Sequence, residues 1–256
     1  MNALARDLQM ALDPVRWAAT LGFEADPWQS DILRSTSRHI LINVCRQGGK
    51  STTTALLALH QAVYRPGSLV LLLSPSLRQS QELYRKVRHF LGVLGADAPK
   101  PSEESSLRLE LANGSRIVSL PGTERTIRGY SAVSLLIIDE AARVEDELYL
   151  SVRPMLAVSG GRLIALSTPW GQRGWWHDSW VNGGESWERT HVTAYDCPRI
   201  SPAFLEEERQ TLGAWHFEQE YLGIFKDAVD AVFSHETVAA AFDADIPTLF
   251  PRFGEE

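Results

Sequence analysis

Four short apolar runs in the first two thirds of the chain constrain its fold more than any other feature. They read HILINV (39–44), SLVLLLS (68–74), VSLLIID (133–139) and GRLIALS (161–167). Runs of this length, bounded by turn residues, are typical of strands buried on both faces. Helical patterns separate the runs and cover residues 51–64, 76–94 and 141–156. Because strands that alternate with helices favour parallel pairing with right-handed crossovers, we predict an α/β fold with a mainly parallel central sheet flanked by helices.

The regions outside this alternation suggest additions to the sheet. In LRLELANGSRIVSL (107–120), two alternating segments flank Asn113-Gly114, which predicts an antiparallel hairpin added to the parallel core. Helical patterns also cover the N-terminal segment and residues 201–222. We expect a helical N-terminal segment (1–35), a core (36–200) and a small lid subdomain with a linker (201–256).

The composition narrows the class of protein. With 256 residues, 44% hydrophobic and 22% charged, the chain resembles ordinary globular proteins and not disordered ones. A net charge of −7 argues against non-specific nucleic-acid binding over the whole surface, but it allows a local basic patch. The two cysteines, Cys45 and Cys197, offer no disulfide framework, and no stretch approaches the apolar length of a membrane helix. We therefore expect a soluble intracellular protein without a membrane partner.

The stretch CRQGGKST (45–52) lies between the first apolar run and a helical pattern. The usual phosphate-binding loop reads G-x-x-x-x-G-K-[ST], and Val44 replaces its first glycine here. The strand–loop–helix context still fits, since backbone N–H groups at a helix start bind anions. Lys50 adds a charge for phosphates and Ser51 a hydroxyl for Mg²⁺. The predicted nucleotide-binding residues are Gln47, Gly48, Gly49, Lys50, Ser51 and Thr52.

Two more polar motifs end apolar runs, where ligands of open α/β sheets bind. In LLIIDEAA (135–142), Asp139 is the candidate ligand of Mg²⁺ and Glu140 the candidate general base for an attacking water. In LSTPWG (166–171), Ser167 and Thr168 are placed to hydrogen-bond a γ-phosphate or the water beside it.

An upstream motif, FEADPWQSDIL (23–33), carries a candidate base-binding group. Gln29 has an amide whose donor and acceptor suit the edge of adenine. Phe23 or Trp28 would stack on the base or pack beneath it, and an aromatic core contact remains the alternative.

The order of DPWQ, CRQGGKS, TIRGYSAVSLLIIDEAA, LSTPWG and FEQEYLGIFKDAVDAVF resembles the large terminase subunits of tailed bacteriophages. The resemblance spans about residues 20 to 235 and includes the deviant loop, because an arginine in R-Q-x-G-K is a trait of that family. It implies a RecA-like P-loop NTPase fold of the additional-strand, conserved-glutamate (ASCE) class.

The resemblance also implies roles for individual residues. Arg46 would touch or sense the γ-phosphate, and Glu140 would be the catalytic glutamate. Asp139 matches the metal-binding acid, Gln29 the adenine-reading glutamine, and Ser167 with Thr168 the motif that couples phosphate loss to DNA movement.

A transition-state arginine would come from a neighbouring subunit. Arg128 is the first candidate and Arg143 the second, with Arg125 and Arg153 as further possibilities. Candidate DNA contacts are the cations Arg78, Arg85, Lys86 and Arg88 with His89 on one helical pattern, and Lys100, Arg108 and Arg116 around the hairpin as an alternative tract.

The function implied is Mg²⁺-dependent ATP hydrolysis that moves double-stranded DNA into a capsid. The implied partners are double-stranded DNA, further copies in a pentameric ring, the portal protein and the small terminase subunit. The place would be the host cytoplasm and, transiently, the procapsid portal vertex, and no nuclease activity is expected of this chain. A helicase-like translocase would need a second RecA-like domain, and an ATP-binding switch without turnover would not need Glu140.

Overall fold

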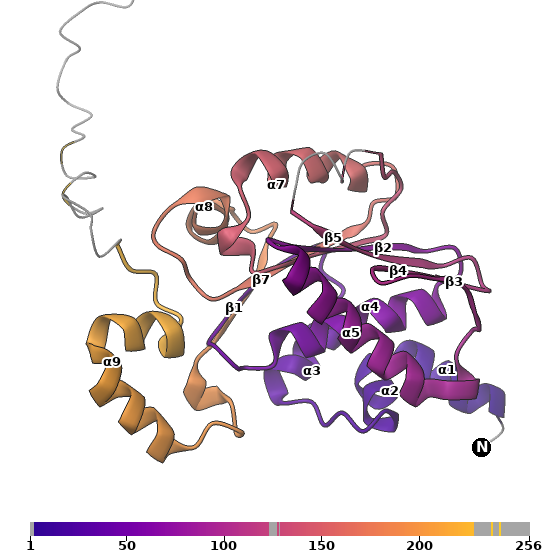
Figure 1. The fold of residues 1–256 in the computed structure, drawn as a ribbon, viewed down its shortest axis with the longest axis horizontal. Helices are drawn as coiled ribbons and strands as arrows, with labels where there is room; N and C mark the ends of the chain where they lie inside the picture. Colours follow the sequence, from indigo (N-terminus) through magenta and orange to yellow (C-terminus); the bar gives the residue numbers. More distant parts are fainter. Residues whose placement is uncertain (1–2, 123–126, 128, 228–236, 238–240, 242–256) are drawn as a thin grey trace, which may run out of the picture.

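A computed structural model of the chain describes residues 3–122, 127, 129–227, 237 and 241. At its centre lies an eight-stranded sheet in the order β3-β4-β5-β2-β6-β7-β1-β8 (Figure 1). The strands are β1 (His39–Val44), β2 (Leu69–Ser74), β3 (Pro101–Glu104), β4 (Arg108–Leu111), β5 (Arg116–Pro121), β6 (Leu135–Asp139), β7 (Arg162–Ser167) and β8 (Glu188–Val192). The strands from β5 to β8 in this order are parallel, while β3 and β4 pair antiparallel with their neighbours. The predicted α/β fold, with a mainly parallel sheet and an added hairpin, is confirmed.

The helices cover both faces of this sheet. They are α1 (Ala3–Leu12), α2 (Pro14–Thr20), α3 (Pro27–Arg34), α4 (Lys50–Tyr64), α5 (Leu77–Leu94), α7 (Asp146–Val152), α8 (Gly174–Asn182) and α9 (Pro202–Leu222). The described residues also form four short 3₁₀ segments: η1 (Gly95–Asp97), η2 (Ala141–Arg143), η3 (Arg153–Leu156) and η4 (Ala194–Asp196). Helices α1 to α5 lie on one side of the sheet and α7 and α8 on the other, with α9 near the end of β1 (Figure 1).

The apolar runs are continuous because their strands are buried on both faces. In β1, Ile40 and Ile42 join the core cluster under α2 to α5, while Leu41 joins the cluster under α7 and α8. The same alternation holds in β6, where Ile137 faces the first cluster and Ile138 the second. Every residue of β2 and β6 is buried, so the predicted strands are confirmed.

Local sequence signals explain where several elements begin and end. The Ser76 hydroxyl accepts a hydrogen bond from the Gln79 N–H and caps α5, as the helical pattern predicts. At the hairpin turn, Asn113 Oδ1 accepts from the Ser115 N–H at 3.0 Å, and Gly114 has a φ of +80° that suits glycine.

The predicted helices in the N-terminal segment and over 201–222 are confirmed, but the backbone interrupts the helical conformation in both regions. Pro14 and Pro27 begin α2 and α3, each after an aspartate at the N-cap position. In α9, Gly213 leaves the helical region with a φ of 73° and a ψ of 162°, which kinks the helix. The division at residues 35 and 200 stays a prediction, and the linker predicted after Gly223 falls largely outside the described residues.

The prediction of one helix over 141–156 is wrong. The chain there forms η2, then extended backbone at Val144 and Glu145, then α7, and then η3 with Pro154 in its first turn. The strand β8 and the helix α8 were not predicted. β8 is an edge strand, and most of its residues are exposed or half-buried. Its sequence therefore has no continuous apolar run from which a strand could be predicted.

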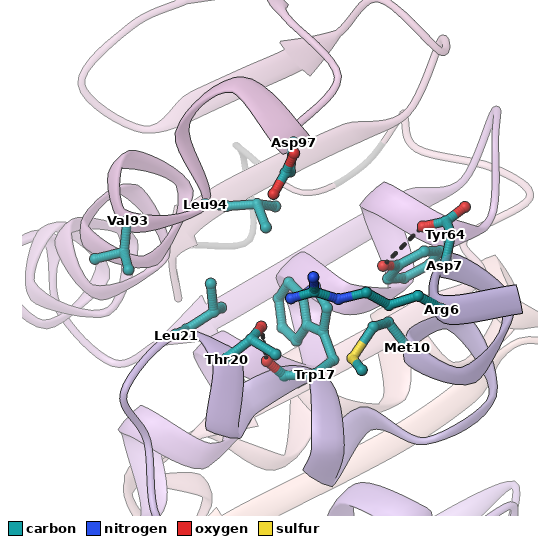
Figure 2. A pocket seen from close by; sticks show the side chains of 10 residues that line it. All are labelled: Arg6, Asp7, Met10, Trp17, Thr20, Leu21, Tyr64, Val93, Leu94 and Asp97. Atoms are coloured by element: carbon teal, nitrogen blue, oxygen red, sulfur yellow. Dashed lines mark hydrogen bonds between the residues drawn. The ribbon is translucent and has the colours of Figure 1, made fainter. Parts of the chain in front are cut away.

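One cavity, of about 560 Å³, lies among the N-terminal helices and the far ends of α4 and α5 (Figure 2). Trp17 of α2, Tyr64 of α4 and Leu94 of α5 line it, and Tyr64 donates a hydrogen bond to Asp7 of α1. Because Tyr64 ends α4, this cavity is remote from the start of that helix, where the predicted phosphate-binding loop lies.

Within the part of the chain that the structure describes, no helix is both long and apolar enough to cross a membrane.

Candidate functional site

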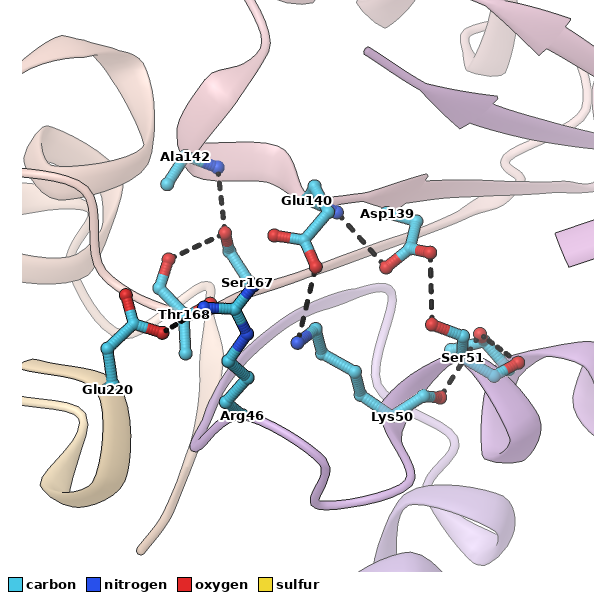
Figure 3. Close-up of polar contacts among 10 residues, drawn as sticks. Arg46, Lys50, Ser51, Asp139, Glu140, Ala142, Ser167, Thr168 and Glu220 are labelled. Atoms are coloured by element: carbon cyan, nitrogen blue, oxygen red, sulfur yellow. Dashed lines mark hydrogen bonds and ion pairs between the residues drawn. The ribbon is translucent and has the colours of Figure 1, made fainter. Parts of the chain in front are cut away.

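The three polar motifs meet at the carboxyl ends of β6, β7 and β1, which are neighbours in the sheet. Asp139 is the last residue of β6 and Ser167 the last of β7, while the loop 45–49 follows β1 and leads into α4. Parallel strands bring their carboxyl ends to the same edge, so the topology gathers these residues from segments far apart in sequence. Figure 3 shows their side chains pointing toward one another.

The loop before α4 is a compact turn made possible by its glycines. Gly49 has a φ of +94°, and a Cβ there would lie 2.7 Å from Gln29 Nε2. A Cβ on Gly48 would lie 2.5 Å from Val44 Cγ1. Val44 itself is the buried last residue of β1 and pairs with Val192 of β8. The strand therefore continues through the position where the usual motif has a glycine, and the turn begins after it.

The inner side of this loop faces β6. Lys50 Nζ lies 3.3 Å from Glu140 Oε1, and Ser51 Oγ donates to Asp139 Oδ2 at 3.0 Å (Figure 3). Glu140 adopts a left-handed conformation, with a φ of 51°, and its N–H donates to Asp139 Oδ1. This unusual backbone turns the Glu140 side chain toward Lys50. The four side chains predicted for phosphate, metal and water chemistry are thus together.

Asp139 is the most deeply buried acid of this group, with 6% of its surface exposed. Burial raises the pKa of Asp139 above its usual value, and the neighbouring charge of Glu140 raises that pKa further. Lys50 and the hydrogen bond from Ser51 oppose this shift. A buried carboxylate whose charge is only partly compensated is a favourable place for a cation.

The third motif connects β7 to the segment after Glu140. The Ser167 hydroxyl donates to the Thr168 carbonyl at 2.7 Å and accepts from the Ala142 N–H at 3.2 Å (Figure 3). Ser167 is fully buried and Thr168 is half-buried. The hydroxyl of Ser167 thus connects two loops of the site through backbone groups.

Arg46 lies on the exposed crest of the loop and contacts α9. Its N–H donates to the Glu220 carbonyl at 2.9 Å, and its guanidinium lies 3.4 Å from Glu220 Oε2. With 67% of its side chain exposed, Arg46 is held by a weak surface pair and can be redirected by a stronger anion.

The outer side of the loop faces α3 and the segment before α9. Arg199 makes a two-pronged ion pair with Asp26, at 2.8 and 2.7 Å, and also donates to the Gly48 carbonyl at 3.2 Å. Gln29 Oε1 accepts from the Asp26 N–H at 2.9 Å in a capping box at the start of α3. These contacts join the DPWQ motif to the loop.

Sequence reasoning missed Arg199, Asp26 and Glu220 as parts of the site. Only the capping pattern at Asp26 is visible locally, and no local signal links it to Arg199, which lies 173 residues away. Trp28 is buried in the core next to this contact, with 7% of its surface exposed, so its ring packs inside the protein in this structure. The adenine-binding role of Gln29 and Trp28 stays a prediction.

Of the four candidate transition-state arginines, Arg143 and Arg153 lie within the described residues, in different parts of the structure. Arg125 and Arg128 fall outside the described residues. Arg143 stacks over the ring of Trp170 at 3.9 Å, on the wall of a cavity of about 720 Å³ that Arg46 also lines. Arg153 donates to the Tyr149 hydroxyl and lies near His39, at the amino end of β1 and so away from the site edge.

The candidate DNA-binding cations separate into two groups. Arg85 pairs with Glu82, Arg88 with Glu104, and Arg108 with Glu103 and Glu110, while Arg78 and Lys100 are exposed. Lys86 differs, because it is half-buried and its ammonium donates to the Thr52 hydroxyl at 3.2 Å. The structure therefore brings Lys86 to the predicted phosphate-binding loop, and the DNA-binding role of the others stays a prediction.

Comparison with known proteins identifies the family of this chain. The family described as "Terminase large subunit, T4likevirus-type, N-terminal" matches residues 41–239. The large terminase subunit of Thermus phage G20c is 26% identical over 249 residues, covering 84% of this chain and 51% of that protein. That of Escherichia phage T5 is 25% identical over 193 residues, covering 72% and 43%. The chain thus spans about half the length of the curated relatives that it matches.

Solved structures support the fold. The ATPase domain of the Thermus phage P74-26 large terminase superposes with a TM-score of 0.69 at 22% identity, covering 82% of this chain and 97% of that one. The large terminase of another thermophilic bacteriophage, solved in complex with ADP, gives a TM-score of 0.61 at 12% identity, covering 78% and 54%. Since the family match extends over far more than half of its residues, the chain belongs to the large terminase subunit family.

Proposed function

We propose that this chain hydrolyses ATP and uses the energy to move double-stranded DNA into a viral capsid. The observation that supports this best is the double pairing at the sheet edge, Lys50 with Glu140 and Ser51 with Asp139. It brings a phosphate-binding cation, a metal-binding pair and a candidate base within contact of one another, which is the set that phosphoryl transfer to water needs.

The donor set at this edge fits Mg²⁺. Ser51 and Asp139 offer hard oxygen ligands, and among the described residues no group of three or more His, Cys, Asp or Glu side chains could hold a metal. Mg²⁺ commonly takes one or two protein oxygens and completes its shell with phosphates and water, so a site of this size suits a metal that arrives with ATP. When bound, the ion would neutralise charge on the β- and γ-phosphates.

Lys50 and Glu140 would exchange partners when ATP binds. The Lys50 ammonium would move from Glu140 to the phosphates, which are stronger and more highly charged acceptors. Glu140 would then be released to orient a water and accept its proton as the water oxygen attacks the γ-phosphorus. The bond from that phosphorus to the β-phosphate bridging oxygen breaks, and ADP leaves with those electrons.

Arg46 would leave Glu220 for the γ-phosphate in the same step. Because the backbone N–H of Arg46 also donates to the Glu220 carbonyl, this movement would shift α9. A second arginine, Arg128 or Arg143, would come from a neighbouring copy in a ring, for which the family's pentamer on the portal protein is the arrangement we propose. Double-stranded DNA and the small terminase subunit complete the proposed set of partners.

The test of the proposed function compares wild type with Glu140→Gln. We expect Glu140→Gln to lower the steady-state ATPase rate by about 10²–10⁴-fold, because it removes the base. ATP affinity, measured by calorimetry with Mg²⁺ present, should be retained. The proposal would be contradicted if the wild type binds ATP but does not hydrolyse it, or if Glu140→Gln hydrolyses ATP as fast as the wild type. The first outcome would favour a nucleotide switch.

The ring arrangement is tested separately by the ATPase rate per subunit at increasing protein concentration. We expect this rate to climb with concentration in the wild type and to stay low in Arg128→Ala or in Arg143→Ala. Mixing the impaired variant with Glu140→Gln subunits should restore turnover, because each supplies what the other lacks. A flat rate per subunit would mean that one chain holds a complete site, and the arginine supplied by a neighbour would be abandoned.

A further inference from the structure

Helix α5 carries several cations, and they differ in where they point. Arg78, Arg85 and Arg88 are exposed, and the last two are paired with surface carboxylates. Lys86 instead is half-buried and extends toward the first turn of α4, where its Nζ lies 3.2 Å from Thr52 Oγ1. Among the described residues, no carboxylate lies within ion-pair distance of the Lys86 ammonium.

The surroundings of Lys86 belong to the phosphate-binding loop. Burial lowers the pKa of Lys86 below its usual value, the charge of Asp139 raises it, and the charge of Lys50 lowers it again. The Lys86 ammonium is thus close enough to sense both the candidate metal ligand and the loop lysine. Glu82, on its own helix, also acts on it, in the same direction as Asp139.

A half-buried ammonium with one hydroxyl as its acceptor retains hydrogen-bonding capacity. An ammonium has three N–H donors, and Thr52 satisfies one of them. Placing a charged group in a desolvated position is costly unless an anion compensates it. Thr52 is the third residue of α4, directly after the lysine and serine assigned to phosphate and metal, so the missing anion would be a phosphate of a bound nucleotide.

We propose that Lys86 binds the phosphate chain of the nucleotide, from the α5 side of the loop, and is not a DNA contact. The inference rests on the proposed function, since it concerns the same nucleotide site. It makes α5 sensitive to nucleotide occupancy, while Arg85 and Arg88 on the same helix remain at the surface.

The experiment measures the ADP dissociation constant by calorimetry for wild type, Lys86→Met, Lys86→Arg and the matched surface control Arg85→Met. Methionine keeps the aliphatic stem and removes the charge. We expect Lys86→Met to weaken ADP binding about tenfold, as the loss of one charge-assisted hydrogen bond does, with partial recovery in Lys86→Arg and no change in Arg85→Met.

Two further measurements separate this role from others. The melting temperature without nucleotide should be the same for Lys86→Met and Arg85→Met, and only Lys86→Met should show a smaller rise on adding ADP. In a Thr52→Val background, Lys86→Met should still weaken ADP binding, because the ammonium contacts phosphate directly and does not act only by fixing the Thr52 hydroxyl.

The possible outcomes distinguish this inference from the proposed function. If wild type binds ADP and Lys86→Met binds it equally well, the inference is overturned while the proposed function stands. It is also overturned if Lys86→Met leaves ADP binding intact but lowers, by about one, the slope of the logarithm of DNA affinity against the logarithm of salt concentration. A side chain that contacts a DNA phosphate behaves in this way. A wild type that binds no nucleotide overturns both.

Discussion

The inner and outer sides of the proposed phosphate-binding loop are held by contacts of different kinds. On the inner side, Lys50 meets Glu140 and Ser51 meets Asp139, and each of these groups also has a proposed partner in the nucleotide, its metal or the attacking water. On the outer side, Arg199 joins Asp26 to the Gly48 carbonyl, and both partners are protein groups already satisfied.

This difference suggests a division of work. In the proposed mechanism the contacts on the inner side are replaced when nucleotide binds, so their loss should change affinity and turnover more than folding. Contacts on the outer side have no reason to break, so their loss should change stability more than chemistry. Arg46 lies between the two sides and contacts Glu220 of α9.

After that of Glu140→Gln, the largest effect is expected from Lys50→Met, also on the inner side. Removing the ammonium that would hold the phosphates should weaken ATP binding by about 10–100-fold, the range of one or two charge-assisted hydrogen bonds. Calorimetric titration with ATP and Mg²⁺ measures this. The melting temperature without ligand serves as the control, and a large fall in it with ATP affinity retained would reverse the division between the two sides.

The second effect concerns the outer side and Arg199→Ala. Asp26 is buried, so removing its partner leaves a carboxylate with reduced compensation. Because half of the Arg199 side chain is exposed, we discount the cost to about 1–2 kcal/mol, or a melting temperature lower by roughly 2–8 °C for a chain of this size.

Arg199→Lys and Asp26→Asn complete this test. Lysine cannot reproduce the two-pronged contact, so Arg199→Lys should recover little of the stability. In Asp26→Asn, Arg199→Ala should cost less, since the pair is already broken. An Arg199→Ala protein that melts like wild type but hydrolyses ATP poorly would assign this arginine to chemistry.

The sequence predicts the inner side better than the outer side, for physical reasons. Strands buried on both faces need continuous apolar runs, and ligand sites follow their carboxyl ends. Asp139, Glu140 and the loop at Lys50 can therefore be recognised from the sequence alone. The contact of Arg199 with Asp26 depends on how two distant segments pack. No local sequence pattern predicts this contact.

The wrong prediction of one helix over 141–156 and the unforeseen position of Lys86 have similar causes. The residues of 141–156 have a composition that suits a helix. However, Glu140 adopts a left-handed backbone conformation and Val144 an extended one, and these two residues prevent one continuous helix. Lys86 and Arg85 are adjacent in the same charge run, yet consecutive residues on a helix point about 100° apart. Only the packing of α5 against α4 decides which of them reaches Thr52.

Gly49→Ala tests whether the two sides need the same loop conformation. Alanine at a φ of +94° is strained, and its Cβ would lie 2.7 Å from Gln29 Nε2, so we expect a loss of about 1–2 kcal/mol in the free energy of unfolding. Gly92→Ala is the matched control. Gly92 lies inside α5 with nothing within 4 Å of the added Cβ, and alanine there should stabilise by about 0.5–1 kcal/mol. Chemical denaturation measures both, and equal effects would show that the loop tolerates a side chain at Gly49.

The smallest effect expected is in the reactivity of the two cysteines. Cys45 begins the loop and Cys197 precedes Arg199, with their sulfur atoms 3.7 Å apart and both side chains buried. The hydrogen bond with Cys197 and burial raise the pKa of the Cys45 thiol, while the hydrogen bond with Cys45 lowers the pKa of Cys197. Because both side chains are buried, an alkylating reagent has little access to either sulfur. Since the chain has only these two cysteines, the total alkylation rate by iodoacetamide reports on this part of the loop. If the outer contacts persist through the ATPase cycle, native protein should alkylate slowly, and ADP or ATP should leave the rate unchanged within about twofold. A rate that rises steeply with ATP would mean that the outer side also opens, and the loop would then move as one unit during turnover.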